Sequence, residues 1–160
     1  MSVVNVRPAR PSDADRVLEL VDALADYEKL PRPDADARAR LRRDGFGPAP
    51  RFSLLVGERD RAIAGYALFF ETYSSFLARP TLYLEDLFVH PDQRKCGLGL
   101  ALFRAVAGEA VERQCGRMEW SVLTWNQLAI DFYERLGAAR MEEWRTFRLT
   151  GDALAAVARG

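Results

Sequence analysis

Cysteine, histidine and net charge are all scarce in this chain. Its 160 residues include two cysteines, one histidine, and 23 basic residues balanced by 23 acidic ones. Cys96 and Cys115 stand apart, without another cysteine or histidine at ligand spacing, so we expect neither a disulfide framework nor a zinc site. The balanced charge also lacks a run of lysine and arginine, and we therefore expect no nucleic-acid partner.

Long hydrophobic runs are missing as well. No stretch approaches the roughly 18 apolar residues of a membrane span. Residues 1–8 do not combine a charged segment with an apolar core, as a secretory signal would. We therefore expect a soluble, unprocessed protein of the reducing cytoplasm, with no membrane partner.

The composition suits one domain. A hydrophobic fraction of 49% in 160 residues can fill one core without disulfides or metal. No internal repeat, linker or low-complexity segment divides the chain. We expect residues 1–160 to form a single domain.

Hydrophobic periodicity predicts the elements of the first half. Val17, Leu20, Val21 and Leu24 recur at helical spacing, after a capping signal in which Ser12 is followed three residues later by an acid. The expected elements are a strand at 3–7, a helix from 12 to about 28, a short solvated helix at 34–44, and antiparallel strands at 52–58 and 62–71 joined by residues 59–61.

The second half alternates strands with helices. Residues 82–89 are almost continuously apolar, which predicts a central strand covered on both faces. A helical stripe from Leu102 to Val111 follows, and Asn126 and Gly137 are placed to cap the two ends of a later helix. The expected elements are a strand at 82–89, a helix at 97–114, a strand at 118–124, a helix at 126–137, a strand at 143–149 and a short terminal helix.

This order of elements predicts the fold class. Antiparallel strands come first and crossover connections later, which is typical of an α+β fold. We expect a central mixed, mostly antiparallel sheet flanked by helices on both faces.

A glycine-containing loop joins strand to helix at residues 94–99, Arg-Lys-Cys-Gly-Leu-Gly. Backbone N–H groups converge at such a junction and bind phosphates. Gly97 and Gly99 allow the backbone to approach a pyrophosphate closely, and Arg94 and Lys95 add positive charge. Short glycine motifs are weak signals, so an ordinary turn is the alternative.

Two carboxylates interrupt the apolar strand at 82–89. Burying an unpaired carboxylate costs several kcal/mol, so Glu85 and Asp86 need partners or a wet cleft. Strand alternation places one on each face. The plain alternative is that they cap backbone or pair with an arginine, and we favour that alternative for Asp86.

Several separated motifs, in this order, resemble the GNAT acetyltransferase superfamily, and within it the spermidine/spermine (diamine)/thialysine acetyltransferase branch. The resemblance covers nearly the whole chain. It is carried by residues 25–28, 44–47, 83–89, 94–99, 125–126 and 132–138.

The resemblance implies acetyl-CoA as the cosubstrate and requires no metal. Leu87 and Val89 would offer backbone hydrogen bonds to the pantetheine arm, and Asn126 with the turn after it would hold the arm's other side. Lys95 departs from the family, which commonly has glycine there. The implied cofactor-binding residues are Leu87, Phe88, Val89, Arg94, Lys95, Cys96, Gly97, Leu98, Gly99, Leu100, Asn126, Ala129 and Tyr133.

By the same resemblance Glu85 is the catalytic base, acting on the amine directly or through water, and Tyr133 is the acid that protonates the departing thiolate. A core aromatic with a satisfied hydroxyl is the alternative for Tyr133. His90 is interpreted as a turn residue. Carboxylates and aromatic faces hold amines, and the implied substrate-binding residues are Tyr27, Glu28, Glu85, Glu119, Trp120 and Glu143, with Glu142 an alternative to the last.

The expected function is acetyl transfer from acetyl-CoA to a primary amine of a small molecule, such as a polyamine, a diamine or a thialysine-like compound. The amine would attack directly in a ternary complex. Alternatives are a GNAT enzyme acting on an amino acid, peptide or drug amine, and a CoA-binding regulatory module without turnover. Relatives in this branch are dimers, so a homodimer is expected.

Overall fold

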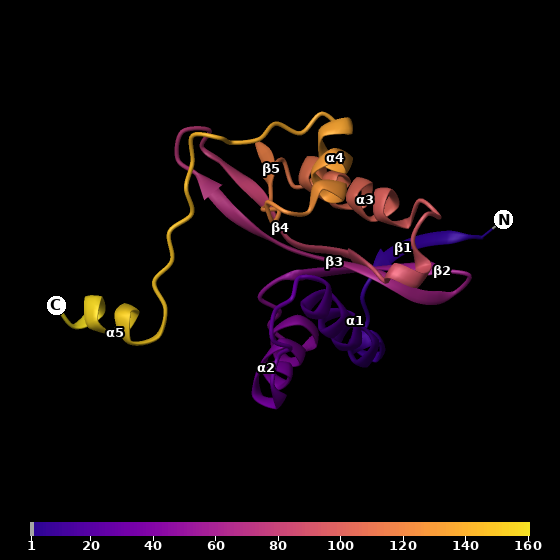
Figure 1. Ribbon diagram of the computed structural model, residues 1–160, viewed down its shortest axis with the longest axis horizontal. Coiled ribbons are helices and arrows are strands. Elements are labelled where there is room, and N and C mark those ends of the chain that lie inside the picture. The colour runs from indigo at the N-terminus through magenta and orange to yellow at the C-terminus, as the bar shows by residue number, and fades with distance from the viewer. Residues whose placement is uncertain (1) are drawn as a thin grey trace. The chain divides into compact units, whose positions relative to one another are not determined.

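Five strands form one sheet, in the order in which they occur along the chain. The computed structural model describes residues 2–160 and consists of two units, one ending at Ser121 and the other comprising Val122–Gly160. The sheet lies in the first unit (Figure 1). Its strands are β1 (Val4–Pro8), β2 (Ser53–Arg59), β3 (Ala62–Ser74), β4 (Arg79–Val89) and β5 (Arg117–Glu119).

Neighbouring strands are antiparallel from β1 to β4, and β5 is parallel to β4. The prediction of a mixed, mostly antiparallel sheet is therefore confirmed. β2 and β3 are joined by Asp60 and Arg61, whose φ angles of 51° and 71° give the left-handed two-residue turn that suits a twisted hairpin. The expected connection was one residue longer, because Arg59 belongs to β2.

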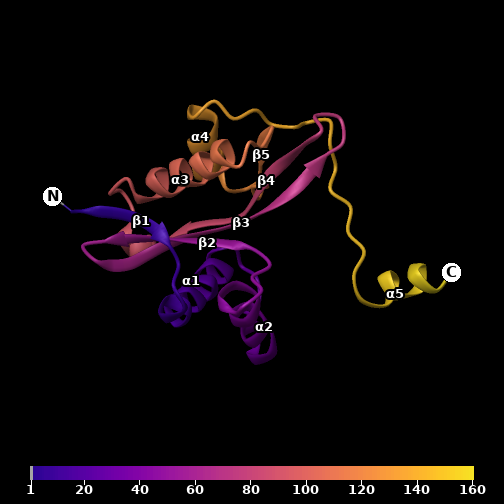
Figure 2. The same ribbon diagram turned by 180° about the vertical axis from the view of Figure 1, so that it is seen from behind.

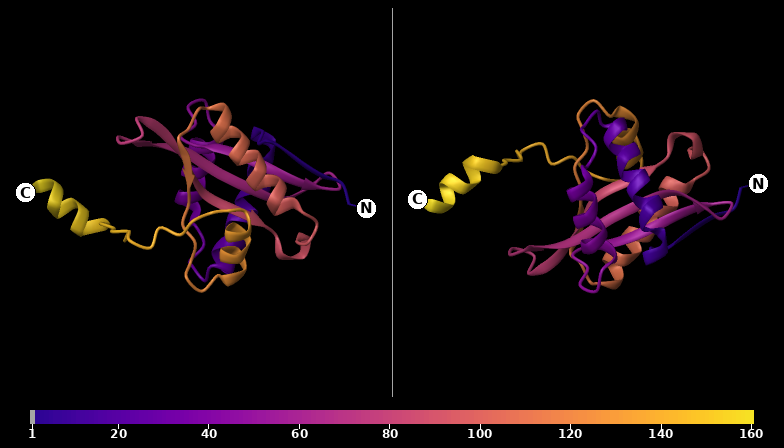
Figure 3. Two further views of the ribbon diagram at one scale, coloured as in Figure 1. Left: turned by 90° about the horizontal axis from the view of Figure 1, so that it is seen from above. Right: turned by 90° about the horizontal axis from the view of Figure 1, so that it is seen from below.

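Helices cover both faces of this sheet. α1 (Ala14–Tyr27) and α2 (Ala35–Phe46) lie on one face, and α3 (Leu98–Glu112) lies on the other (Figures 1 and 3). The core accordingly has two parts, one packed under α3 and the other under α1. In α3 the predicted stripe is buried at Leu102, Val106 and Ala110 and half-buried at Phe103 and Ala107, but Val111 at its end is exposed.

The start of α1 differs from the prediction. A 3₁₀ turn, Pro11–Asp13, precedes the helix, and Asp13 rather than Ser12 stands at its N-cap. The Asp13 carboxylate accepts a hydrogen bond from the Arg10 backbone at 2.7 Å and pairs with Arg7 of β1 at 2.7 Å. Arg7 in turn pairs with Glu58 of β2 at 2.8 Å, so a distant strand helps to hold the group at the start of the helix.

The second unit holds two helices, α4 (Gln127–Arg135) and α5 (Gly151–Arg159), and its caps follow the prediction. The Asn126 side chain accepts from the Ala129 backbone at 3.3 Å, and Gly137 has a φ of 92° after the helix. The strand expected at 143–149 is absent from residues 2–160: Figure 2 shows a plain trace between α4 and α5. Its aromatic residues Trp144 and Phe147 are exposed.

The strand expected at 118–124 is reduced to the three residues of β5. The terminal helix is confirmed as α5. Within residues 2–160, no helix has both the length and the apolar character needed to span a bilayer.

Candidate active site

β4 is paired on both sides for only part of its length. β3 accompanies it from Arg79 to Val89, whereas β5 pairs with it only at residues 81–83. Beyond that point no strand of residues 2–121 occupies the β5 side of β4. Because strand backbone groups are obligatory hydrogen-bonding groups, the edge at Leu87, Phe88 and Val89 suits an extended, amide-containing ligand.

The loop after β4 exposes backbone donors at the start of α3. The first hydrogen bond within the helix runs from Ala101 N to Gly97 O at 3.0 Å, so the N–H groups of Leu98, Gly99 and Leu100 have no acceptor inside the helix. Gly97 has a φ of 84°, and a Cβ added there would meet no atom within 4 Å. Open donors at a helix N-terminus fit a pyrophosphate.

Lys95 also has a left-handed backbone, with φ of 63°. A side chain in that conformation costs about 1 kcal/mol or more, which glycine avoids. This explains in physical terms why a glycine suits the second position of the motif. Lys95 is exposed, whereas Cys96 is half-buried and donates its thiol to the Gln93 carbonyl at 3.2 Å.

Arg94 connects this loop to the end of α1. Its Nε donates to the Val89 carbonyl at 3.0 Å. The guanidinium carbon lies 4.7 Å from the centre of the Tyr27 ring and 5.7 Å from that of Phe88, so the cation rests on two aromatic faces. Arg94, which is expected to bind a phosphate, therefore also contacts Tyr27, which is predicted to bind the amine.

A β-bulge lies at Glu85. Leu68 of β3 is opposite Asp86, while the next residue, Phe69, is opposite Leu84, so Glu85 is the extra residue. The strict alternation expected for the strand is interrupted here. The Asp86 carboxylate accepts a hydrogen bond of 2.9 Å from the hydroxyl of Tyr66, a fully buried residue in the core under α1. Glu85 itself is exposed.

Three carboxyl groups influence one another at this point. Burial raises the pKa of Asp86 to about 6; the Tyr66 hydroxyl opposes that rise, and the nearby charges of Glu85 and Glu28 add to it. Burial and the Glu85 carboxylate also raise the pKa of Glu28, which follows the last residue of α1. Carboxylates close enough for their charges to raise the pKa of a neighbour form a site favourable to a cation.

The expectation that Asp86 would cap backbone or pair with an arginine was wrong. Neither an arginine nor a backbone group holds it; the hydroxyl of Tyr66 does. The same environment raises the pKa of Tyr66 well above its ordinary value, through burial and the Asp86 charge. Tyr66 therefore remains a hydrogen-bond donor at any physiological pH.

The predicted substrate residues fall into separate groups. Glu28 and Glu85 interact, and Tyr27 lies beside Phe88 with ring centres 6.3 Å apart. Glu119 instead pairs with Arg117 at 2.6 Å, and Trp120 packs edge-on against Phe103 of α3, with ring centres 5.3 Å apart. Glu143 is an exposed residue of the second unit.

Tyr133 lies in α4, where its ring meets Phe132 edge-on with centres 5.2 Å apart. Burial raises the pKa of Tyr133 to about 12. The phenol is therefore protonated at neutral pH, as a proton donor must be. His90 is a turn residue as interpreted, since its Nδ1 accepts from the Asp92 backbone at 3.3 Å.

Sequence comparison identifies the family to which these features belong. Residues 17–138 match the acetyltransferase (GNAT) family. The chain belongs to this family. As a GNAT protein it is an acetyl-CoA-dependent N-acetyltransferase.

Individual relatives agree with this assignment. A thialysine N-epsilon-acetyltransferase of Bos taurus is 35% identical over 169 residues, which cover 99% of both chains. An L-ornithine N5-acetyltransferase of Arabidopsis thaliana is 50% identical over 98 residues, 61% of this chain and 43% of that protein. An integron cassette protein from the mobile metagenome of V. cholerae shares the GNAT fold with a TM-score of 0.84 at 21% identity, over 98% of each chain.

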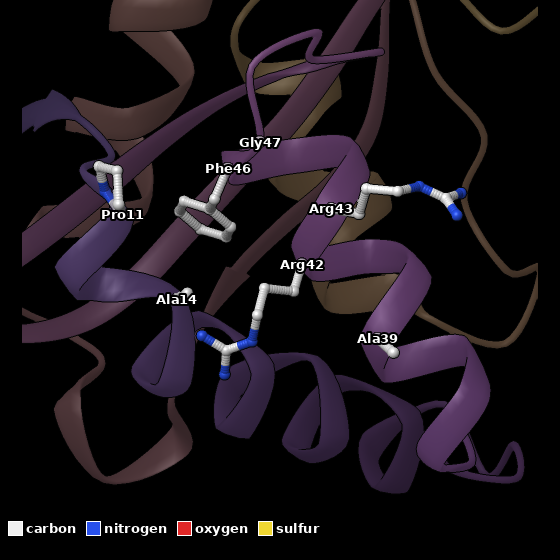
Figure 4. Close-up of a pocket in the computed structure, with 7 residues that line it drawn as sticks. All are labelled: Pro11, Ala14, Ala39, Arg42, Arg43, Phe46 and Gly47. Atoms are coloured by element: carbon white, nitrogen blue, oxygen red, sulfur yellow. The ribbon is translucent and has the colours of Figure 1, made fainter.

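A pocket elsewhere in this GNAT protein contains none of the predicted site residues. It lies between the beginning of α1 and the end of α2 (Figure 4). Its two arginines already have partners, because Arg42 pairs with Asp15 and Arg43 with Asp44. It is lined by Pro11, Ala14, Ala39, Arg42, Arg43, Phe46 and Gly47.

Tyr66 is the residue that sequence reasoning missed. It lies in the apolar run of β3, where a tyrosine resembles any other core residue. Its approach to Asp86 depends on the register between β3 and β4, which the bulge at Glu85 shifts. The available signal was a hydroxyl in one apolar strand and a carboxylate in its antiparallel neighbour.

Proposed function

We propose that this GNAT enzyme transfers the acetyl group of acetyl-CoA to a primary amine of a small cationic molecule, of the thialysine, diamine or polyamine class. The observation that carries the proposal is the group formed by Glu28, Glu85 and Asp86: burial raises the pKa values of Glu28 and Asp86, and the charges of neighbouring carboxylates add to both shifts. A cationic acceptor relieves that repulsion. The full-length similarity to a thialysine N-epsilon-acetyltransferase supports the same class of acceptor.

Acetyl-CoA supplies an acetyl group activated as a thioester. The N–H groups of Leu98, Gly99 and Leu100 would hold its pyrophosphate, with Lys95 and Arg94 adding positive charge and Cys96 and Gly97 shaping the loop. The free edge of β4 at Leu87, Phe88 and Val89 would bind its pantetheine amides. Asn126, Ala129 and Tyr133 complete the proposed cofactor-binding set.

Glu85 is the proposed base. An ammonium group cannot attack a thioester until it loses a proton, and the exposed Glu85 carboxylate can accept that proton directly or through one water. Its place in a bulge turns it out of the regular strand, beside Glu28 and Asp86. Tyr27, Glu28, Glu119, Trp120 and Glu143 remain the proposed amine-binding set, with support strongest for the first two.

Tyr133 is the proposed acid. Its phenol, with a pKa of about 12, is fully protonated at neutral pH and can donate to the departing thiolate. Orientation of the amine and polarisation of the thioester carbonyl by backbone donors would supply most of the rate enhancement. The scheme requires no covalent enzyme intermediate and no metal.

One specific observation favours a second acceptor class within the same chemistry. The 50% identity to an L-ornithine N5-acetyltransferase over 98 residues supports an amino acid with a side-chain amine. A regulatory CoA-binding module without turnover is the contrasting alternative. Tyr133→Phe separates it from an enzyme, because the variant should bind acetyl-CoA normally and turn over about 100-fold more slowly.

We propose that residues 1–160 work as one domain, in a homodimer, in the cytoplasm. Full-length coverage of a relative supports the single domain. Both cysteines are free thiols, which suits a reducing compartment. Exposed aromatic residues, among them Phe76 and Phe147, support association with a second copy, which light scattering after gel filtration would reveal.

The test is acetyl-CoA-dependent thiol release by the purified protein with thialysine, lysine, ornithine, putrescine, spermidine, spermine and short peptides. Selective turnover of small cationic amines is the expected result. Turnover of peptides alone would show that the acceptor is a peptide and not a small cationic amine. No turnover with any amine, together with stabilisation by acetyl-CoA in a thermal shift, would favour the regulatory module.

A further inference from the structure

The Tyr66–Asp86 pair is a polar contact inside an otherwise apolar core. Tyr66 has no exposed surface and is surrounded by the cluster that includes Val17, Leu20 and Phe88. A buried tyrosine hydroxyl needs a partner, and here the partner is an ionisable acid at 2.9 Å. A phenylalanine facing an apolar residue would pack at lower cost, so the pair calls for a functional explanation.

Position explains what the pair can do. Asp86 follows the bulge residue Glu85 directly and lies near Glu28 at the end of α1. One carboxylate oxygen, Oδ2, accepts from the Tyr66 hydroxyl, which approaches from the core. Within residues 2–160 the other oxygen, Oδ1, accepts no hydrogen bond and is not fully enclosed, so it can accept one from a ligand.

We propose that Tyr66 is a positioning residue for amine recognition: its hydroxyl holds the Asp86 carboxylate so that the second oxygen binds the cationic amine. This inference rests on the proposed function, and it adds to that function a residue that no motif indicates. Tyr66 itself touches no substrate. It acts by keeping the half-buried Asp86 ionised and correctly oriented.

Several groups around Asp86 determine when it is charged. Burial and the carboxylates of Glu85 on β4 and Glu28 on α1 favour its protonated form, while the hydroxyl of Tyr66 on β3 favours the ionised form. Arg94 rests on the rings of Tyr27 and Phe88 and does not contribute to the shift at Asp86. Because the pKa of Asp86 is about 6, amine capture should weaken as the pH falls through 6.

Tyr66→Phe removes only the hydroxyl. We expect the acidic limb of the kcat/KM profile to move upward by about one pH unit, since a hydrogen bond to a charged group has roughly that effect. Near pH 6.5 the amine KM should rise roughly threefold with kcat within about twofold, and the difference should vanish above pH 8. A loss that persists equally at every pH would mean a structural role and overturn the proposal.

Tyr83→Phe is the matched control. Tyr83 lies on β4, the strand that carries Asp86, but its hydroxyl meets the Ser121 hydroxyl at 3.3 Å rather than an acid. Its variant should keep the wild-type pH profile. Equal profiles for Tyr66→Phe and the wild type would contradict the proposal.

A second measurement needs neither turnover nor a stable Tyr66→Phe protein. Amine binding at pH 6, followed by calorimetry in buffers of different ionisation enthalpy, should release up to about half a proton from the wild type, because Asp86 is then half protonated. Asp86→Asn, which retains an oxygen for Tyr66, should release much less and bind the amine more weakly. Unchanged proton release and affinity in Asp86→Asn would exclude the role of Asp86.

The outcomes separate this inference from the proposed function. If the wild type acetylates no amine, the proposed function fails. Proton release on amine binding still tests whether the Tyr66–Asp86 pair binds amines. If the wild type acetylates amines and all variants share its pH profile and proton release, only the role of Tyr66 fails.

Discussion

The two faces of the sheet differ in what they bury. Under α3 the sheet and helix contribute aliphatic and aromatic side chains, such as Leu82, Leu84 and Leu102. Under α1 a comparable cluster ends at a tyrosine bonded to a half-buried acid. The first face stabilises the fold, whereas the second gives up stability to place charge near a proposed substrate. Variants on each face should therefore separate activity from stability.

Glu85→Gln should have the largest effect on activity. It removes the proposed base from the bulge while keeping its size, so kcat should fall by about 100- to 1,000-fold. The melting temperature should hardly change, because Glu85 is exposed. Steady-state kinetics beside a thermal melt test both statements. Nearly normal kcat would remove Glu85 from the mechanism.

Leu102→Ala should show the opposite pattern. Leu102 is fully buried under α3, and truncating such a leucine costs about 3 kcal/mol through lost burial and the cavity left behind. Denaturant unfolding should reveal this loss. Turnover per folded molecule should stay within about threefold at a temperature where the variant is folded. A strong fall in kcat would show that the α3 face also governs catalysis.

Asp86→Asn should stabilise the protein at neutral pH. The pKa of Asp86 is raised from 3.8 to about 6 in the folded protein, so folding favours the protonated acid. The raised pKa of Asp86 contributes to the free energy of unfolding in full below pH 3.8, and this contribution is lost as the pH rises through 6. The contribution is at most about 3 kcal/mol. The variant should therefore be more stable to denaturant than the wild type at pH 8 and equally stable at pH 4. The same difference at both pH values would contradict this assignment.

Lys95→Gly should have the smallest effect. The left-handed backbone at residue 95 suits glycine, so the variant should gain about 0.5 to 1 kcal/mol of stability. Loss of one exposed cation should raise the KM for acetyl-CoA about two- to threefold at low salt and less at high salt. Titrating acetyl-CoA at two ionic strengths tests the second effect, with Ala78→Gly, also left-handed and exposed, as the control for backbone strain.

Sequence predicted the apolar side of this comparison well. The periodicity of Val17 and Leu20, and of Leu102 and Val106, identifies helix faces that the structure buries. The caps at Asn126 and Gly137 are local signals, and both are confirmed. Such features depend on residues a few positions apart, which is why one sequence suffices to find them.

The remaining features depend on distant parts of the chain. The Asp13 carboxylate at the start of α1 is held by Arg7, which pairs in turn with Glu58 of β2. Tyr66 finds Asp86 only because a bulge shifts the register of two strands. Residues 143–149 were expected to form a strand, but a strand also needs a neighbour with which to pair, and the local sequence cannot report one. The catalytic roles came from a family resemblance, and kinetics must test them.

Arg94 has a consequence for how the enzyme could be altered. The same guanidinium lies in the loop proposed to bind pyrophosphate and on the ring of Tyr27, a residue proposed to bind the amine. Its Nε also fixes the Val89 carbonyl at the end of β4. We therefore expect that affinities for the two substrates cannot be adjusted independently through position 94. An engineer who seeks a new acceptor would do better to leave that arginine untouched and vary Glu28.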